Sequence, residues 1–263
     1  MNLIGTAKKF VPLAMRRRML PVAKFAYRDD LCKLATFYGT DKWGGHWYMQ
    51  HYQRYFEPLR KKPLNLLEIG VGGDKDPRTG GQSLRTWKRF FPKARIVGID
   101  IFDKTHFSQP RIDVRICDQT DAMGLRKLSD EYGGFDIIID DGSHVNEHVI
   151  KTFHALFPLL RPNGIYAIED TQTSYWPSFG GGLDKPDTML GFFKSLTDGL
   201  NYMEYSAAPG PDDFERNIVE IAFFHNLVII RKGRNDEKSN LPDFVQRETG
   251  RANLIPSHNQ VGN

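Results

Sequence analysis

Residues 135–144 read Phe-Asp-Ile-Ile-Ile-Asp-Asp-Gly-Ser-His, and residues 164–170 read Gly-Ile-Tyr-Ala-Ile-Glu-Asp. In both stretches a short apolar run ends abruptly in carboxylates, which is typical of parallel strands whose carboxyl ends carry a site. The side chains expected to meet at this edge of the sheet are Asp140, Asp141, Glu169, Asp170 and His144. Carboxylates beside an imidazole suggest a hard-cation site next to a general base.

Predicted strands and helices alternate on both sides of these two stretches. The strands are expected at 64–71, 95–101, 114–117, 135–139 and 165–168, and the helices at 30–38, 83–91, 121–132, 146–160 and 187–199. Ser83 is the expected N-cap of the second helix, and 161–164 is an expected turn. Two final β runs, 219–224 and 227–232, flank a hairpin signal at His225-Asn226. This order predicts an α/β, Rossmann-like, doubly wound and mostly parallel sheet with a C-terminal antiparallel hairpin.

The length of 263 residues fits one α/β domain with an appendage. We expect a basic lead and helical cap at 1–60, the main domain at 61–233 and a polar tail at 234–263. No apolar run reaches the roughly 18 residues that span a bilayer, and the N-terminus lacks a clear secretory signal. Cys32 and Cys117 are far apart and fit free thiols in a reducing compartment. These features predict a cytoplasmic protein.

The net charge of +4 is unevenly distributed along the chain. Residues 1–28 contain seven basic side chains and no acidic one, which leaves 29 basic and 32 acidic side chains, a net −3, in the rest. Apolar residues interleave with the basic ones, so this lead is a candidate for peripheral contact with an anionic membrane. The alternative is a solvated segment or a subunit contact. A nucleic-acid partner is not expected, because the sequence shows no basic stripe beyond the lead.

Glycines and acids follow the first three predicted strands. Glu68-Ile-Gly70-Val-Gly72-Gly73 closes the first strand, and glycines there let a ligand approach the backbone closely. Asp100 ends the next strand and suits ribose hydroxyls, while Asp118-Gln119 ends the third and suits an adenine ring. In this order the acids resemble those of class I S-adenosylmethionine (AdoMet)-dependent methyltransferases. A nicotinamide cofactor is the alternative, although the long acidic stretch after the glycines suits a ligand without phosphates.

The resemblance narrows at Ile139-Asp-Asp-Gly-Ser-His144 and Ile168-Glu-Asp-Thr-Gln-Thr-Ser-Tyr-Trp176. These segments resemble the metal-dependent sugar O-methyltransferases of macrolide biosynthesis. Gly39-Thr-Asp-Lys42, His46 and Ser83-Leu-Arg-Thr-Trp87 match the same family, so the resemblance covers roughly residues 30–232. The family implies homo-oligomers as well as the fold and the reaction.

The resemblance also implies roles for the residues at the two strand ends. Asp141, Glu169 and Asp170 are the expected Mg²⁺ ligands, and His144 is the expected general base. A cation that binds two adjacent sugar hydroxyls can lower the pKa of one and orient it. Asp140 should point to the opposite face, where a cofactor contact or a structural hydrogen bond is expected. His144 as a metal ligand, or as a helix-start residue without chemistry, is the alternative.

Further substrate contacts are expected from two loops. Tyr175 and Trp176 are candidates for stacking on a sugar, and Thr40 and His46 for contacts from the N-terminal region; simple packing onto the domain is the alternative. Together these assignments predict an AdoMet- and Mg²⁺-dependent O-methyltransferase whose acceptor is a sugar hydroxyl of a natural product or surface glycan. Another vicinal diol as acceptor, a non-catalytic AdoMet- or metal-binding partner protein, and a nicotinamide oxidoreductase remain alternatives.

Overall fold

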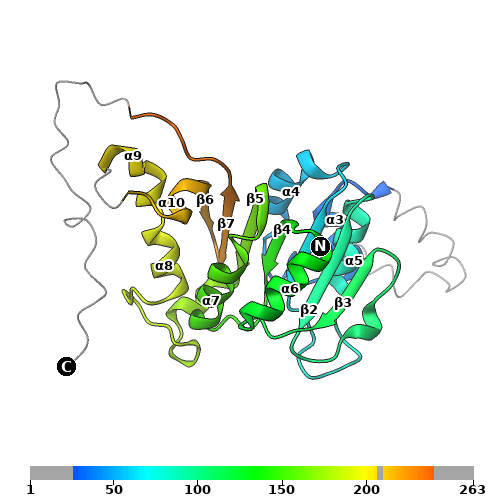
Figure 1. Ribbon diagram of the computed structural model, residues 1–263. Coiled ribbons are helices and arrows are strands. Elements are labelled where there is room, and N and C mark those ends of the chain that lie inside the picture. The colour runs from blue at the N-terminus through cyan, green and yellow to red at the C-terminus, as the bar shows by residue number, and fades with distance from the viewer. Residues whose placement is uncertain (1–25, 206–209, 240–263) are drawn as a thin grey trace, which may run out of the picture.

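The structure, a computed structural model, describes residues 26–205 and 210–239. Its centre is a seven-stranded sheet of order β3-β2-β1-β4-β5-β7-β6 (Figure 1). The strands are β1 (Asn65–Ile69), β2 (Arg95–Asp100), β3 (Ile112–Ile116), β4 (Phe135–Asp140), β5 (Leu160–Glu169), β6 (Ile218–Phe224) and β7 (Leu227–Lys232). The first five are parallel, whereas β7 runs antiparallel to β5 and to β6. The predicted mostly parallel sheet with a terminal hairpin is therefore confirmed.

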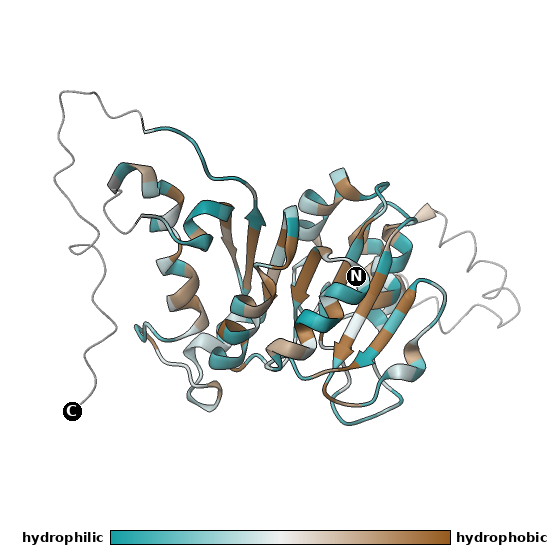
Figure 2. Cartoon of the chain, in the orientation of Figure 1, coloured by the Kyte–Doolittle hydropathy of each residue, from teal (hydrophilic) through white to brown (hydrophobic). Residues whose placement is uncertain are grey.

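Helices cover both faces of the sheet. The α-helices are α3 (Leu31–Tyr38), α4 (Met49–Phe56), α5 (Gln82–Phe90), α6 (Ala122–Tyr132), α7 (Asn146–Leu156), α8 (Met189–Ser195), α9 (Tyr202–Tyr205) and α10 (Asp213–Asn217). Short 3-10 turns, η1 (Glu57–Leu59), η2 (Thr105–Phe107), η3 (Thr171–Tyr175), η4 (Pro177–Phe179) and η5 (Asp198–Asn201), join them. Apolar residues fill the central strands and polar residues face outward on the helices (Figure 2), the pattern of a parallel sheet buried on both sides.

Two local predictions are wrong. Ser83 is not the N-cap of α5, because Gly81 holds that position in a left-handed conformation and the Ser83 hydroxyl bonds to Glu68 instead. The predicted turn at 161–164 is part of β5, where the ladder with β4 shifts register and Asn163 has a φ of 63°. In both cases a tertiary contact, invisible in the local sequence, decides where the element begins.

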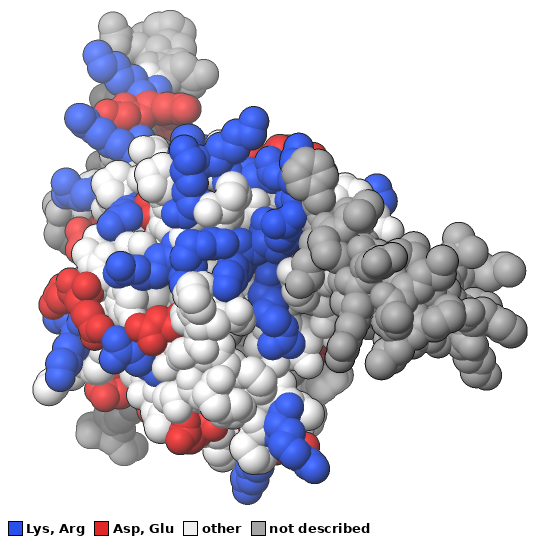
Figure 3. Space-filling view, turned by 90° about the vertical axis from the view of Figure 1, so that its right-hand side faces the viewer, with Lys and Arg blue, Asp and Glu red and all other residues white. Residues whose placement is uncertain are grey.

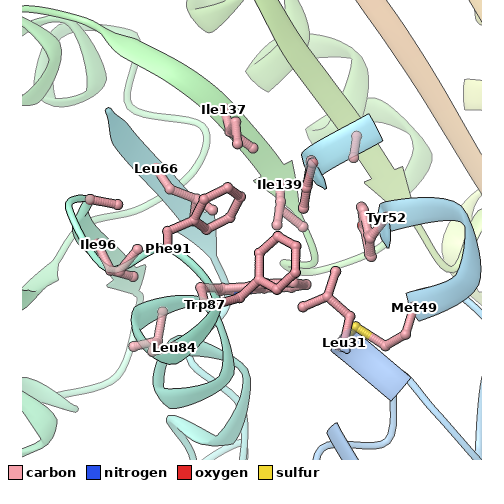
Figure 4. Close-up of a cluster of buried hydrophobic side chains, with 14 of the residues drawn as sticks. Leu31, Met49, Tyr52, Leu66, Leu84, Trp87, Phe91, Ile96, Ile137 and Ile139 are labelled. Atoms are coloured by element: carbon pink, nitrogen blue, oxygen red, sulfur yellow. The ribbon is translucent and has the colours of Figure 1, made fainter. Parts of the chain in front are cut away.

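Helices α3 and α4 share one hydrophobic core with the sheet. Leu31, Tyr52 and Trp87 come from three different helices and pack together over Leu66 and Ile137 of the strands (Figure 4). The rings of Tyr52 and Trp87 meet edge to face with centroids 5.4 Å apart, a favourable aromatic geometry. This packing fixes α4 against the carboxyl ends of the strands and brings its tyrosines to the predicted site.

The surface has a basic face that the sequence did not reveal. Lys and Arg side chains gather on the side of the molecule that carries α5 in Figure 1 (Figure 3). Helix α5 leaves Arg85, Lys88 and Arg89 partly exposed, and the Arg111 guanidinium donates to the carbonyl of Lys88. The folded part of the chain thus groups basic residues that are scattered in sequence. None of the helices in the described ranges is long and apolar enough to cross a membrane. Most of the predicted basic lead, residues 1–25, and most of the predicted tail, residues 240–263, lie outside the described residues.

Candidate active site

The predicted acids meet because β1, β4 and β5 are neighbours and end at the same edge. The backbone N–H of Asp141 donates to the Ile69 carbonyl at 3.0 Å, so the turn after β4 lies directly on the end of β1. Asp140 is in register with Ile168 of β5, which places Glu169 next to the same turn. Parallel register thus converts two separated sequence motifs into one cluster of side chains.

Two site residues adopt left-handed backbone conformations. His144 has a φ of 57° and Asp170 a φ of 52°, values that a non-glycine residue rarely adopts and that cost free energy unless the surroundings enforce them. The enforcement is visible: the Thr173 hydroxyl donates to the His144 carbonyl at 2.8 Å and also lies 3.1 Å from the Asp170 carbonyl. The two strained turns therefore support each other, and they aim both side chains at one point.

Asp141, His144 and Asp170 converge tightly enough to bind one ion. One ligand atom from each lies within 4.8 Å of the others, and His144 Nε2 is 3.6 Å from Asp170 Oδ2. All three are only partly buried, so the cluster is open to a ligand. The two carboxylates suit a hard cation such as Mg²⁺, whereas the ring nitrogen is a donor that zinc accepts more readily.

Asp170 is stabilised as an anion by α4 and its approach loop. The Tyr48 hydroxyl donates to Asp170 Oδ1 at 2.6 Å, and the His46 Nδ1 lies 3.5 Å from the same oxygen. Burial alone would raise the pKa of Asp170, but the Tyr48 hydrogen bond and the nearby rings of His144 and His46 hold it below its usual value. A carboxylate at this position is thus ionised and ready to bind a cation at neutral pH.

Glu169 lies deeper and is held by two donors. It is 2 % exposed, with Oε1 accepting from the Tyr52 hydroxyl at 2.7 Å and Oε2 from the Lys42 ammonium at 2.7 Å. Burial and the neighbouring Asp141 raise the pKa of Glu169 well above its usual value. The predicted third metal ligand therefore adjoins the Asp141–His144–Asp170 cluster but is bonded within the protein.

Three further residues contact the strand-end carboxylates, and the sequence did not predict these contacts. Lys42, Tyr48 and Tyr52 donate to the strand-end carboxylates from 99 to 127 positions away in the chain. The available signal was Lys42 in a matched motif followed by an aromatic-rich helix. A lysine in a glycine-rich turn normally lies in solvent, so the sequence does not predict a buried side chain at this position. In the folded protein Lys42 is only 2 % exposed.

A cavity lined by the glycine loop opens beside these acids. It measures about 300 Å³ and its lining residues are Gly39, Thr40, Asp41, Lys42, Gly70, Val71, Gly72, Gly73, Thr79, Gly80, Gln82, Ser83 and Asp141. A Cβ on Gly70 would lie 2.0 Å from the Asp141 carbonyl oxygen, and its φ is 88°. Only glycine fits at position 70, so the loop and the metal-site turn touch backbone to backbone.

The predicted cofactor acids occupy the neighbouring strand ends. Asp100 accepts from the Val71 and Phe102 backbone N–H groups, each at 2.9 Å, which ties the glycine loop to β2. Asp118 is exposed and caps its own turn through Thr120. Large apolar side chains are also exposed around the carboxyl ends of β2 and β3 and at the start of α6, namely Ile101, Phe102, Ile116 and Met123.

Gln119 and Glu68, two other predicted cofactor residues, point inward. Gln119 is 7 % exposed, and its Oε1 accepts from the Ser143 N–H at 2.6 Å. Its Nε2 donates to Thr152 at 3.1 Å, so it braces the turn that carries Asp141 and His144. Glu68 is 0 % exposed and is not among the lining residues of the cavity.

Asp140 is buried on the opposite side of the strand from the cavity. It is 1 % exposed, and its Oδ2 has no hydrogen-bond partner among the described residues. Burial raises the pKa of Asp140 to about 7, against the smaller opposing effect of the Gly142 N–H. The folded protein therefore binds a proton here in a pH range where the unfolded chain has released it.

This proton makes a testable difference to stability. Because the folded pKa lies above the unfolded one, the stability that Asp140 contributes should fall as pH rises from about 4 to about 7, by about 1.4 kcal/mol per pH unit. Asp140→Asn lacks this loss, so its stability relative to the wild type should increase through that range and level off above it. Urea unfolding in EDTA from pH 5 to 8, with the exposed Asp236→Asn as control, measures the difference. A constant difference across this range would contradict the buried-proton interpretation.

The predicted substrate residues differ in exposure, because Thr40 is 7 % exposed whereas Tyr175 and Trp176 are half-exposed. Tyr175 and Trp176 are each 47 % exposed, and the Trp176 ring also contacts that of Phe179 with centroids 5.8 Å apart. Their loop is anchored by Asn146, whose Nδ2 donates to the Phe179 carbonyl at 2.8 Å and whose Oδ1 accepts from the Met189 N–H at 2.7 Å. The other two predicted substrate residues come from the N-terminal region: Thr40 lines the cavity, and His46 faces Asp170.

The strand order and the strand-end site define the fold of a class I methyltransferase. A solved structure of the MycE methyltransferase of the mycinamycin biosynthetic pathway, in complex with Mg, SAH and mycinamycin VI, superposes with a TM-score of 0.79 at 47% identity. The match covers 83% of this chain and 57% of that one. No family model matches the chain.

Two curated relatives show which methyltransferases the chain resembles in sequence. The chain is 46% identical over 227 residues to the mycinamicin VI 2''-O-methyltransferase of Micromonospora griseorubida, covering 84% of this chain and 57% of the relative. It is 43% identical over 221 residues to the 8-demethyl-8-alpha-L-rhamnosyl tetracenomycin-C 2'-O-methyltransferase of Streptomyces olivaceus, covering 83% and 58%. The chain is thus a homologue of the sugar O-methyltransferases of macrolide and tetracenomycin biosynthesis, and it spans a little more than half of their length.

Proposed function

We propose that this protein is an AdoMet- and Mg²⁺-dependent O-methyltransferase that acts on a sugar hydroxyl. The observation that carries the proposal is the convergence of Asp141, His144 and Asp170 within 4.8 Å, beside a glycine-lined cavity. The cluster supplies the acceptor side of a transfer and the cavity the donor side. The homology to sugar O-methyltransferases supports the same assignment.

Asp141, Asp170 and the adjoining Glu169 would hold the ion, and the donor set fits a hard cation. Mg²⁺ bound there supplies Lewis-acid polarisation of a sugar hydroxyl. His144, on the open side of the cluster, would accept the hydroxyl proton at a ring nitrogen; the methyl group would pass from the AdoMet sulfur to the sugar oxygen and leave S-adenosylhomocysteine. Asp170, 3.6 Å from the His144 ring, stabilises the positive charge that this proton transfer creates.

The cofactor site is proposed at the glycine loop. Gly70 and Gly72 would leave room for the methionine part of AdoMet, and Asp100 and Asp118, at successive strand ends, would bind the ribose and the adenine. The exposed apolar side chains beyond these strands, such as Ile101 and Phe102, give the adenine ring an apolar surface. Calorimetric titration with AdoMet and with NAD separates this proposal from the nicotinamide alternative.

Turnover with candidate acceptors tests the whole proposal. The protein is mixed with AdoMet, Mg²⁺ and glycosides that carry vicinal hydroxyls, and methylated product is measured by mass spectrometry. We expect methylation of a sugar and none of the free aglycone. Methylation of catechols alone would favour the other vicinal-diol function, and AdoMet binding without turnover of any acceptor would favour a non-catalytic role.

The acceptor contacts and the larger organisation are also proposals. Tyr175 and Trp176 would stack on the sugar from one side, with Thr40 and His46 opposite. Residues 1–60 would cap the domain at 61–233, and 234–263 would form a tail. The protein would act in the cytoplasm as a homo-oligomer, and the basic lead at 1–28 would contact either an anionic membrane or another subunit.

A further inference from the structure

Lys42 is a buried cation in direct contact with the predicted metal ligands. Its ammonium lies 2.5 Å from Asp141 Oδ2, 2.7 Å from Glu169 Oε2 and 3.5 Å from Glu68 Oε1. The contacts with Asp141 and Glu169 are hydrogen bonds, and the contact with Glu68 is a longer ion pair. Lys42 therefore directs two of its donors to the predicted metal ligands, although it also lies in the cavity wall.

Glu68 is held in place from the other side. Its Oε2 accepts from the Ser83 hydroxyl at 2.9 Å and from the Trp87 indole N–H at 3.1 Å. Both donors are on α5, and Trp87 is 0 % exposed in the core described above. Glu68 thus connects a rigid helix to the Lys42 ammonium and has no exposed surface to offer a cofactor.

We propose that Glu68 and Lys42 are positioning residues for the metal ligands, and that Glu68 serves the metal side of the site rather than the cofactor side. The chain of contacts runs from Trp87 and Ser83 through Glu68 to Lys42, and from there to Asp141 and Glu169. Residues that orient metal ligands in this way commonly change metal affinity by roughly 10- to 100-fold when replaced. The inference rests on the proposed metal site.

Charge balance supports the same assignment. When Glu68, Asp141, Glu169 and Asp170 are ionised, the site carries four negative charges against the single positive charge of Lys42, and a divalent cation balances two of the remaining three. An uncompensated cluster of this kind inside a protein is costly. Lys42 therefore reduces the repulsion among the carboxylates while it fixes two of them next to each other.

Glu68→Gln is the sharpest test, because it removes the charge and keeps the shape. The amide oxygen can still accept from Ser83 and Trp87, but the amide group no longer attracts the Lys42 ammonium. Calorimetry measures Mg²⁺ affinity without AdoMet and AdoMet affinity in EDTA. We expect Mg²⁺ affinity to fall about 10-fold or more, and AdoMet affinity to stay within about twofold of the wild type.

Asp100→Asn is the matched control on the cofactor side, where we expect the reverse pattern. Lys42→Met should weaken Mg²⁺ binding at least as much as Glu68→Gln; if it does not fold, Glu68→Gln still decides. Unchanged Mg²⁺ affinity in Glu68→Gln, or a loss of AdoMet affinity in it, overturns the inference. A wild-type protein that binds no Mg²⁺ would instead overturn the proposed function.

Discussion

Replacing Asp141 with alanine is expected to lower kcat/KM by roughly 10³-fold or more. Asp141 is the one carboxylate that belongs both to the open cluster with His144 and Asp170 and to the contacts of Lys42. Its loss removes a metal ligand and frees the Lys42 ammonium, so several kcal/mol of transition-state stabilisation by the cation should be lost. Initial rates with AdoMet and a glycoside acceptor that the wild type methylates measure the effect.

Removal of Mg²⁺ by a chelator tests the metal mechanism independently of the Asp141 variant. Excess EDTA should abolish turnover by the wild type, added Mg²⁺ should restore it, and Asp141→Ala should respond to neither. Asp236→Ala, in which an exposed acid paired with Arg234 is removed, is the control and should keep wild-type turnover. If Asp141→Ala and EDTA both leave turnover unchanged, the metal mechanism is wrong.

His144→Asn is expected to lose most turnover while it keeps AdoMet binding. A positioned general base contributes roughly 10²- to 10⁴-fold, and asparagine has no group that takes up a proton at neutral pH. Asparagine also tolerates the left-handed conformation that position 144 requires, so the backbone turn should persist. Rates and AdoMet affinity are measured on the same preparation, and turnover within a few-fold of the wild type would exclude His144 as the base.

The same variant separates the two roles open to His144. If His144 is the base, the His144→Asn variant should keep nearly unchanged Mg²⁺ affinity. If His144 is a metal ligand, the variant should lose Mg²⁺ affinity together with its rate. His148→Ala is the neighbouring control, because His148 bonds to the Ser143 hydroxyl at 3.0 Å but is not part of the cluster. Retained turnover in His148→Ala is expected.

Much of the fold could be read from the sequence because parallel strands leave a strong local signal. Apolar runs such as Ile137–Ile139 have to be buried on both faces, and their abrupt ends at Asp140 and Glu169 mark the edge at which a site can form. Some element boundaries were predicted wrongly because a tertiary contact outweighed the local preference of a residue. Ser83, for example, bonds to Glu68 instead of capping α5.

The sequence by itself determined the sheet, the strand-end carboxylates and the position of His144, because these depend on residue periodicity and on the shared direction of parallel strands. Only the tertiary structure decided which side chains surround those carboxylates. Lys42, Tyr48 and Tyr52 reach Asp141, Asp170 and Glu169 through the packing of α4 against the sheet, and no local pattern encodes a contact across 99 to 127 residues. For the same reason Glu68, which in sequence precedes a cofactor loop, faces a buried lysine in space.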